Sequence, residues 1–221
     1  MFRLALCCAL LACASPAWGY GYTRDEDPLL KAFRAAVRAA RAGDLAAARD
    51  QAAGVEWQLR ELEQPEDLGV SFREALRAAH APGTPPAVTV AAWANLVCLA
   101  LLQKFHWNLR EGLADYHRAR ARLDAAQTYY ELALAGNVRR RDAAARKANP
   151  KAPSRHEDIV KTFAAARRAL GSPGLFGAGK RPPDAAAFRA AVRRIVGHLR
   201  AVFPDFVFPG TAAPPGRERR R

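Results

Sequence analysis

The sequence predicts an all-α protein, a bundle of about six to seven helices around a central apolar helix (88–110). Half of the 221 residues are apolar and a quarter are charged, as in a folded globular chain. Alanine, the strongest helix former, occurs 50 times, against 15 glycines. Apolar residues recur at helical spacing between segments rich in glycine and proline. A sheet-dominated fold is therefore not expected.

The first 19 residues have the pattern of a secretory signal peptide. Arg3 supplies a positive charge, residues 4–14 are apolar, and Ala17-Trp18-Gly19 has the small-x-small form of a cleavage site. This apolar run is too short for a bilayer span, which needs about 20 residues. We expect cleavage after Gly19 and an exported protein, periplasmic or secreted, with no transmembrane span in its mature part.

Lipidation at Cys13 is the alternative, because Leu10-Leu11-Ala12-Cys13 resembles a bacterial lipobox. Cleavage after Gly19 leaves Cys98 as the only cysteine, so no internal disulfide is expected. Cys98 lies between two apolar residues, and we expect a buried structural role rather than a nucleophile.

The chain is strongly basic, with a formal net charge of +14. In the cytosol such a charge would suggest nucleic acid, but an exported protein does not normally meet it. We therefore expect the partner to be an envelope protein or an anionic surface, and no nucleic acid.

Three helices are expected before the break at residue 81. Asp25-Glu26-Asp27-Pro28 places acids and a proline at the start of a helix that runs to about Ala42. Gly43-Asp44 ends it and caps a second helix, which runs to about Glu63. Ser71-Phe72-Arg73-Glu74 has the form of a capping box, which predicts a third, shorter helix to about His80.

The most apolar part of the mature chain follows the proline-rich break at 81–86. We expect a central helix that is buried on most sides, with a core made of Trp93, Leu96, Leu99, Leu102, Phe105 and Leu109. Gly112 is expected to kink or divide the long helical stretch. Beyond it, a 3-4-3-4-3 repeat suited to lengthwise packing comprises Tyr116, Ala119, Leu123, Ala126, Tyr130 and Ala133.

Two more helices are expected in the last third of the chain. Gly136-Asn137 is expected to end the long helix and lead into a mobile basic connection over 138–151. A capping box at Ser154-Arg155-His156-Glu157 starts a helix that ends at Gly171 and buries Ile159, Val160, Phe163 and Leu170. Asp184 caps the last helix, after which Phe206 and Phe208 strap the bundle.

One folded domain is therefore expected over 20–208, followed by a disordered basic tail at 209–221.

One segment, from Gly174 to Lys180, satisfies the phosphate-loop pattern G-x-x-x-x-G-K. Such a loop needs a preceding strand and a hydroxyl residue for magnesium, whereas here a helix precedes and Arg181 follows. We interpret it as an ordered loop with Leu175 and Phe176 in the core. No catalytic motif occurs, so no enzyme activity is expected; an enzyme with no recognisable motif is the alternative.

Metal is the only cofactor for which the sequence offers candidate ligands, and no other cofactor is expected. Glu111 and Asp115 lie one helical turn apart, and His117 or a neighbouring helix would have to complete the shell, because two carboxylates alone bind weakly. The Glu-x-x-His pairs of carboxylate bundles do not occur. The alternative is a solvated face, with Asp115 near Arg118 and Glu131 near Gln127.

Three short segments carry a resemblance to a known family. They are Gly43-Asp44 between two alanine-rich helices, Leu109-Arg110-Glu111-Gly112-Leu113 with Tyr116, and Gly174-Leu175-Phe176-Gly177 before the last helix. With these, residues 28–204 resemble the small exported helical accessory proteins of bacterial iron-permease systems. The resemblance implies a periplasmic accessory or metal-handling role. The chain lacks the G-x-H-x-x-E motif of the imelysin-like type, so no metal ligands are carried over.

The expected function is that of an exported, non-catalytic helical accessory or binding protein of the bacterial envelope, linked to metal (iron) uptake. Besides an enzyme, the alternative is a polyanion- or membrane-surface-binding protein that uses its arginine-rich faces.

Overall fold

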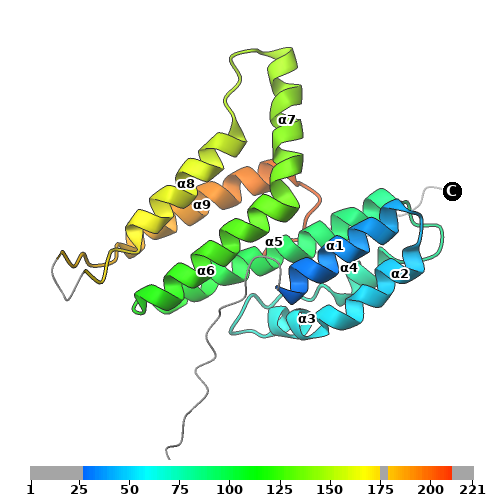
Figure 1. Ribbon diagram of the computed structural model, residues 1–221, viewed down its shortest axis with the longest axis horizontal. Helices are drawn as coiled ribbons and strands as arrows, with labels where there is room; N and C mark the ends of the chain where they lie inside the picture. Colours follow the sequence, from blue (N-terminus) through cyan, green and yellow to red (C-terminus); the bar gives the residue numbers. More distant parts are fainter. Residues whose placement is uncertain (1–26, 175–178, 211–221) are drawn as a thin grey trace, which may run out of the picture.

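The computed structural model describes residues 27–174 and 179–210, and these form an all-α bundle (Figure 1). No strand occurs in these two ranges, and seven of the α-helices have eight residues or more. The elements are α1 (Pro28–Arg41), α2 (Leu45–Asp50), the 3₁₀ helix η1 (Gln51–Val55), α3 (Glu56–Glu63), α4 (Arg73–Ala78), α5 (Pro86–Arg110), α6 (Tyr116–Tyr129), the π-helix η2 (Tyr130–Leu134), α7 (Ala135–Ala148), α8 (Arg155–Ala169) and α9 (Ala185–Val202). The predicted fold class is confirmed.

Side-chain caps fix where five helices begin, at Asp27, Asp44, Asp115, Ser154 and Asp184. Each cap oxygen accepts a hydrogen bond from the backbone N–H three residues later and so satisfies a donor that has no partner within the helix. The predicted starts at Asp44, Ser154 and Asp184 are confirmed.

The capping box predicted at Ser71 is wrong. α4 begins at Arg73 after Phe72, and the hydroxyl of Ser71 donates instead to Glu63 Oε1 at 3.2 Å. Glu63 also accepts from Arg73 Nε at 2.9 Å. The carboxylate at the end of α3 therefore engages the hydroxyl of Ser71, and Glu74, the other member of the predicted box, pairs with Arg77 instead.

α5 lies at the centre of the bundle, and both α1 and α6 pack lengthwise against it (Figure 1). Trp93, Leu96 and Leu99 are fully buried, Leu102 and Phe105 are nearly so, and Leu109 is partly buried against the same core. The predicted core is therefore confirmed. Packing α5 on several sides removes most of its apolar surface from water, which is the main favourable term in folding.

The long apolar stretch divides at Gly112, as predicted. α5 ends at Arg110, and Gly112 and Leu113 both have a φ of 62° before Asp115 caps α6. This left-handed region suits glycine but strains a leucine. Leu113 is only 3% exposed, so burial of its side chain offsets the strain.

The helix end predicted at Gly136-Asn137 is wrong, and so is the mobile connection, because residues 135–148 form α7. Leu134, Ala135 and Val138 are fully buried, and this burial outweighs the penalty of about 1 kcal/mol for glycine within a helix. α7 diverges from α6 (Figure 1) after a π-helical turn, a common site of bends. Across this turn the buried position moves from the predicted Ala133 to Leu134.

α8 and α9 pack against each other and close the other side of the bundle (Figure 1). Ile159, Phe163 and Leu170 are buried as predicted, but Val160 is 41% exposed and that prediction is wrong. Val160 directly follows Ile159, and adjacent residues of a helix point in directions about 100° apart. α8 ends at Ala169, close to the predicted end at Gly171, and Gly171 has a left-handed φ of 76°.

In the described part of the chain, α5 is the one helix long and apolar enough to cross a membrane, with 67% of the relevant window buried inside the protein. A core helix passes the same test. The expected signal peptide at 1–19, the lipidation alternative at Cys13 and residues 211–221 of the expected tail lie outside the described residues.

Candidate functional site

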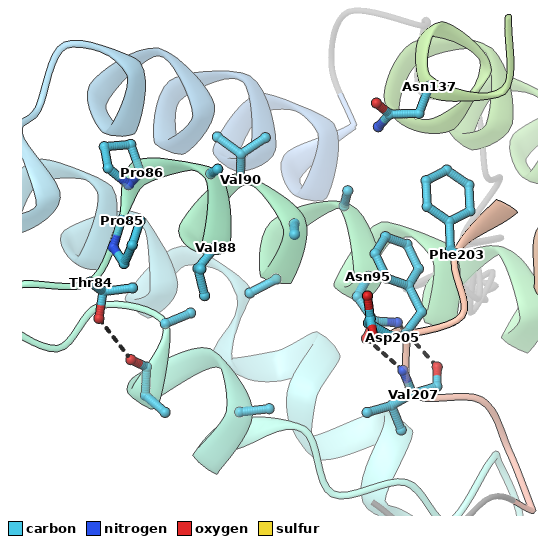
Figure 2. A pocket seen from close by; sticks show the side chains of 18 of the residues that line it. Thr84, Pro85, Pro86, Val88, Val90, Asn95, Asn137, Phe203, Asp205 and Val207 are labelled. Carbon is cyan, nitrogen blue, oxygen red and sulfur yellow. Dashed lines mark hydrogen bonds between the residues drawn. The ribbon is translucent and has the colours of Figure 1, made fainter. Parts of the chain in front are cut away.

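An open groove with apolar walls runs along the first half of α5 (Figure 2). Its volume is about 1330 Å³, and its lining comes from the end of α1, Phe72 and α4, residues 83–85, α5, α7 and residues 202–207. Val88 is 48% exposed here, although the sequence suggested that α5 would be covered on most sides. One side of the least polar helix is therefore open to solvent.

Small side chains create the hollow. Ala75 and Ala78 on α4 and Ala87 and Ala91 on α5 all line the groove and are all exposed. Val88 is the largest exposed apolar side chain of this part of α5.

Two hydrogen bonds hold α4 against α5 beneath the groove. Thr89 Oγ1 donates to the carbonyl oxygen of Ala79 at 2.6 Å, and Trp93 Nε1 donates to His80 Nε2 at 3.0 Å. His80 Nδ1 lies 2.7 Å from the carbonyl oxygen of Leu76. A carbonyl accepts only, so Nδ1 carries the proton and Nε2 is the free acceptor. Burial lowers the pKa of His80, which favours this neutral form.

The segment after α9 closes one end of the groove. The buried amide of Asn95 donates to the carbonyl oxygen of Val207 at 3.1 Å and accepts from its N–H at 2.8 Å, as Figure 2 shows. Phe203 and Phe206 stack with ring centroids 4.5 Å apart, and Phe208 is buried. The expected aromatic strap is therefore present.

The groove carries a positive charge. Its lining includes Arg41 at the end of α1 and Arg140 and Arg141 on α7, whereas Asp205 is the only acid among the described lining residues. Neither Arg41 nor Arg141 forms an ion pair with another described residue. Their charges face solvent and are available to an anionic partner.

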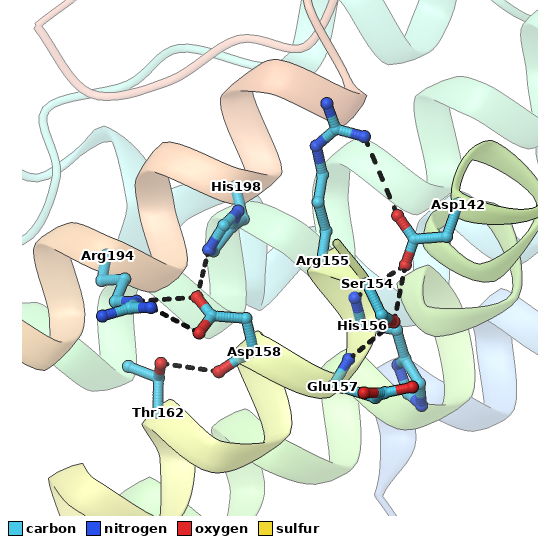
Figure 3. A network of polar contacts seen from close by, with 9 residues as sticks. All are labelled: Asp142, Ser154, Arg155, His156, Glu157, Asp158, Thr162, Arg194 and His198. Atoms are coloured by element: carbon cyan, nitrogen blue, oxygen red, sulfur yellow. Dashed lines mark hydrogen bonds and ion pairs between the residues drawn. The ribbon is translucent and has the colours of Figure 1, made fainter. Parts of the chain in front are cut away.

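A polar network (Figure 3) fixes the position of the basic helix α7. The carboxylate of Asp142, which is 4% exposed, accepts from Ser154 Oγ at 3.1 Å and from the N–H of His156 at 2.9 Å, at the start of α8. Arg155 Nη1 lies 3.8 Å from its other oxygen. Because Asp142 follows Arg141 directly, these bonds also hold the arginines in place beside the groove.

The same network connects α8 to α9. Arg194 donates to both carboxylate oxygens of Asp158, and His198 Nε2 contacts one of them (Figure 3). The hydrogen bonds from Arg194 hold the pKa of Asp158 below its usual range. Asp158 is therefore an anion at neutral pH and holds two helices together.

The predicted metal-ligating residues lie at the α5–α6 turn. Both oxygens of Glu111 accept from Arg122, at 2.8 and 2.9 Å, and Asp115 caps α6 by accepting from the N–H of Arg118 at 3.0 Å. These interactions keep the pKa values of Glu111 and Asp115 below their usual range. His117 is exposed beside Tyr116.

Among the described residues, no group of three or more His, Cys, Asp or Glu side chains is placed to hold a metal ion. Glu131 accepts from Gln127 at 2.8 Å, and Asp115 lies 3.7 Å from Arg118. These are the two pairs that the alternative interpretation, a solvated face, had predicted.

Cys98 is buried, and burial raises the pKa of its thiol to about 12, so it is not a nucleophile at neutral pH.

A second polar cluster holds α3 to α5. Gln103 accepts from Gln58 Nε2 at 2.9 Å and donates to Asp67 Oδ1 at 3.1 Å and to Glu61 Oε2 at 3.3 Å. Trp107 Nε1 also donates to Asp67. Each of these side chains bonds to Gln103 or to Asp67, which gives the cluster a role in packing.

The segment that matches the phosphate-loop pattern lacks the required setting. It follows α8 rather than a strand, and Arg181 pairs with Ser172 through two backbone hydrogen bonds of 3.0 Å. Leu175 and Phe176, expected in the core, lie outside the described residues.

No protein-family model, curated protein or solved structure matches the chain. The site is therefore judged on its own geometry. The groove was not predicted from the sequence, although the alanines of α5 and the three consecutive arginines at 139–141 lie in two of its walls.

Proposed function

We propose that the protein is an exported, non-catalytic accessory or binding protein of the bacterial envelope, and that its binding site is the groove along α5. The observation that carries this proposal is an open apolar surface on the central helix, bordered by arginines that have no acidic partner among the described residues. Open apolar surfaces with polar rims are typical of interaction sites.

The chemistry of the lining supports binding rather than catalysis. Among the described lining residues there is no histidine, cysteine, serine or lysine, and Thr84 Oγ1 donates to the carbonyl oxygen of Ala78 at 3.4 Å. A nucleophile next to a general base is therefore missing from the groove. The link to iron uptake comes only from the sequence resemblance and stays a prediction.

A photo-cross-linking amino acid placed at Val88 in living cells tests the proposal. Val160, on the exposed face of α8, is the matched control, because both valines are exposed to a similar degree, 48% and 41%. We expect a discrete adduct at Val88 in the envelope fraction, on protein that mass spectrometry shows to begin at Tyr20. An intact Met1 terminus in the cytoplasm, or no adduct beyond that of Val160, would contradict it.

A second candidate function, binding to an anionic membrane surface, is favoured by α7. Its exposed side chains include Arg139, Arg140, Arg141, Arg146 and Lys147, and its only acid, Asp142, is buried. Salt-sensitive sedimentation with phosphatidylglycerol vesicles would support this function, since screening weakens exposed charge interactions.

A further inference from the structure

We propose that the groove binds an acidic amphipathic α-helix of a partner protein. This inference rests on the binding role proposed above and specifies the partner of the same site. It depends on three properties of the groove, which are its dimensions, the small side chains that line it and the sign of its charge.

The dimensions fit a helix better than a small molecule. Small-molecule pockets usually occupy about 300 to 1,000 Å³ and enclose most of the ligand. This groove measures about 1330 Å³ and is open enough to leave Val88 48% exposed. Its stretch of α5, from Pro86 to Asn95, is about 14 Å long at 1.5 Å per residue, which matches two to three turns of a docked helix.

The surface of the groove allows close approach of a helix. Ala87 and Ala91 lie one turn apart on α5, and Ala75 and Ala78 lie one turn apart on α4. Rows of residues with this spacing form the ridges and grooves through which helices pack. The exposed isopropyl group of Val88 would insert between side chains on the apolar face of the partner.

The charges determine which helix is favoured. Arg41, Arg140 and Arg141 border the apolar floor, with Asp205 as the single opposing charge in the described lining. Asp142 ties α7 to α8, so Arg140 and Arg141 are held there by the fold. A helix with glutamates flanking its apolar face complements this pattern, and a lysine-rich helix is repelled.

The chain's own C-terminal segment does not complement the groove. Residues 211–221 include Arg217, Arg219, Arg220 and Arg221 and only one acid, Glu218, so they carry the same sign of charge as the rim. A separate acidic partner is therefore favoured over this segment of the chain.

A display library of amphipathic helical peptides, whose flanking positions are either Glu or Lys, tests the inference with the exported protein as bait. We expect glutamate-rich peptides to be enriched by about tenfold over lysine-rich ones, which corresponds to about 1.4 kcal/mol. Val88→Asp should abolish the enrichment, and the double variant Arg140→Glu, Arg141→Glu should reverse the preference. The matched control is Arg189→Glu, Arg193→Glu on the exposed side of α9, which changes the net charge equally and should keep the wild-type preference.

Other results would overturn the inference. These are equal enrichment of both peptide types, a preference for lysine, or a preference that the Arg140 and Arg141 changes leave intact. Val88-dependent dimerisation in sedimentation would identify a second copy as the occupant instead. Val88-dependent binding to phosphatidylglycerol vesicles without peptide enrichment would identify a membrane surface. If cross-links form at Val88 in cells but acidic peptides are not enriched, only this inference fails; without cross-links, the proposed function fails as well.

Discussion

At the scale of single residues, buried polar side chains determine which surfaces meet around the groove. Asn95 pairs with the backbone of Val207, and Thr89 and Trp93 bond to the end of α4. Each of these polar groups would cost free energy if it were buried without a partner, so each contact fixes the local arrangement. None of these partners can be read from the sequence, because the paired residues lie at least ten positions apart.

The pair formed by His80 and Trp93 makes the stability of the protein depend on pH. His80 is neutral in the folded state, and burial lowers its pKa below the ordinary value of 6.5 in the unfolded chain. Between these two pKa values the unfolded chain binds more protons, so the free energy of unfolding decreases as the pH falls below about 6.5. Above that pH the contribution is constant.

Urea unfolding at pH 7 and pH 5 measures this effect. We expect His80→Gln to lower stability at pH 7, because the bond from Trp93 is weakened, and to reduce the loss between pH 7 and pH 5. His117→Gln changes an exposed imidazole on α6 and serves as the control. An unchanged pH dependence in His80→Gln would show that His80 does not titrate as inferred.

The metal hypothesis also belongs to the scale of residues. Metal binding by Glu111 would require Arg122 to leave both carboxylate oxygens, and binding by Asp115 would compete with a helix cap that is worth about 0.5 to 2 kcal/mol. We therefore expect no tight transition-metal site at these residues. Arg122→Gln removes both of these hydrogen bonds, leaves Arg118 Nη1 3.8 Å from Glu111, and should strengthen any weak binding there.

Calorimetric titration with ferrous, ferric, cupric and zinc ions checks this expectation. Micromolar or tighter binding by the wild type that disappears in Glu111→Ala, Asp115→Ala would prove it wrong. Tight binding that survives both changes would place the site elsewhere in the chain.

At the scale of elements, the sequence predicted helix boundaries best where the residues that fix them are close together in the chain. Asp44, Ser154 and Asp184 cap helices as predicted, because the cap and its backbone partner are only three residues apart. It was misleading at Ser71, where the side chain bonds to Glu63 on another helix. Gly136 failed as a stop signal for a similar reason, because burial of its neighbours depends on helices distant in sequence.

The groove could not be predicted for a related reason. Residues 88–102 are apolar on nearly all sides, so the sequence pattern does not show which side stays uncovered. Which side stays uncovered depends on the direction of α7 after the π-helical turn and on the position at which Asn95 binds the segment after α9. The candidate ligands Glu111 and Asp115 were visible in the sequence. The bond between Glu111 and Arg122 was not, because these residues are eleven positions apart and lie on either side of the α5–α6 turn.

At the scale of the whole molecule, α5 connects the two sides of the bundle. It packs against α1 and α3 on one side and against α6 and α9 on the other. Phe105 contacts both Phe163 of α8 and Phe188 of α9, with ring centroids 5.9 and 6.4 Å apart. One shared core of this kind should make unfolding a single cooperative transition, as expected for one domain over 20–208.

The tryptophans offer a direct test of this cooperativity, because Trp57, Trp93 and Trp107 all lie on α3 and α5, and α8 and α9 contain none. We expect urea unfolding curves from tryptophan fluorescence and from far-ultraviolet circular dichroism to coincide. Ile195→Ala removes a fully buried side chain of α9, which should cost about 2 to 5 kcal/mol and shift both curves equally. If the fluorescence transition instead kept its wild-type midpoint in Ile195→Ala, the α8–α9 pair would unfold separately, and the protein would consist of two folding units.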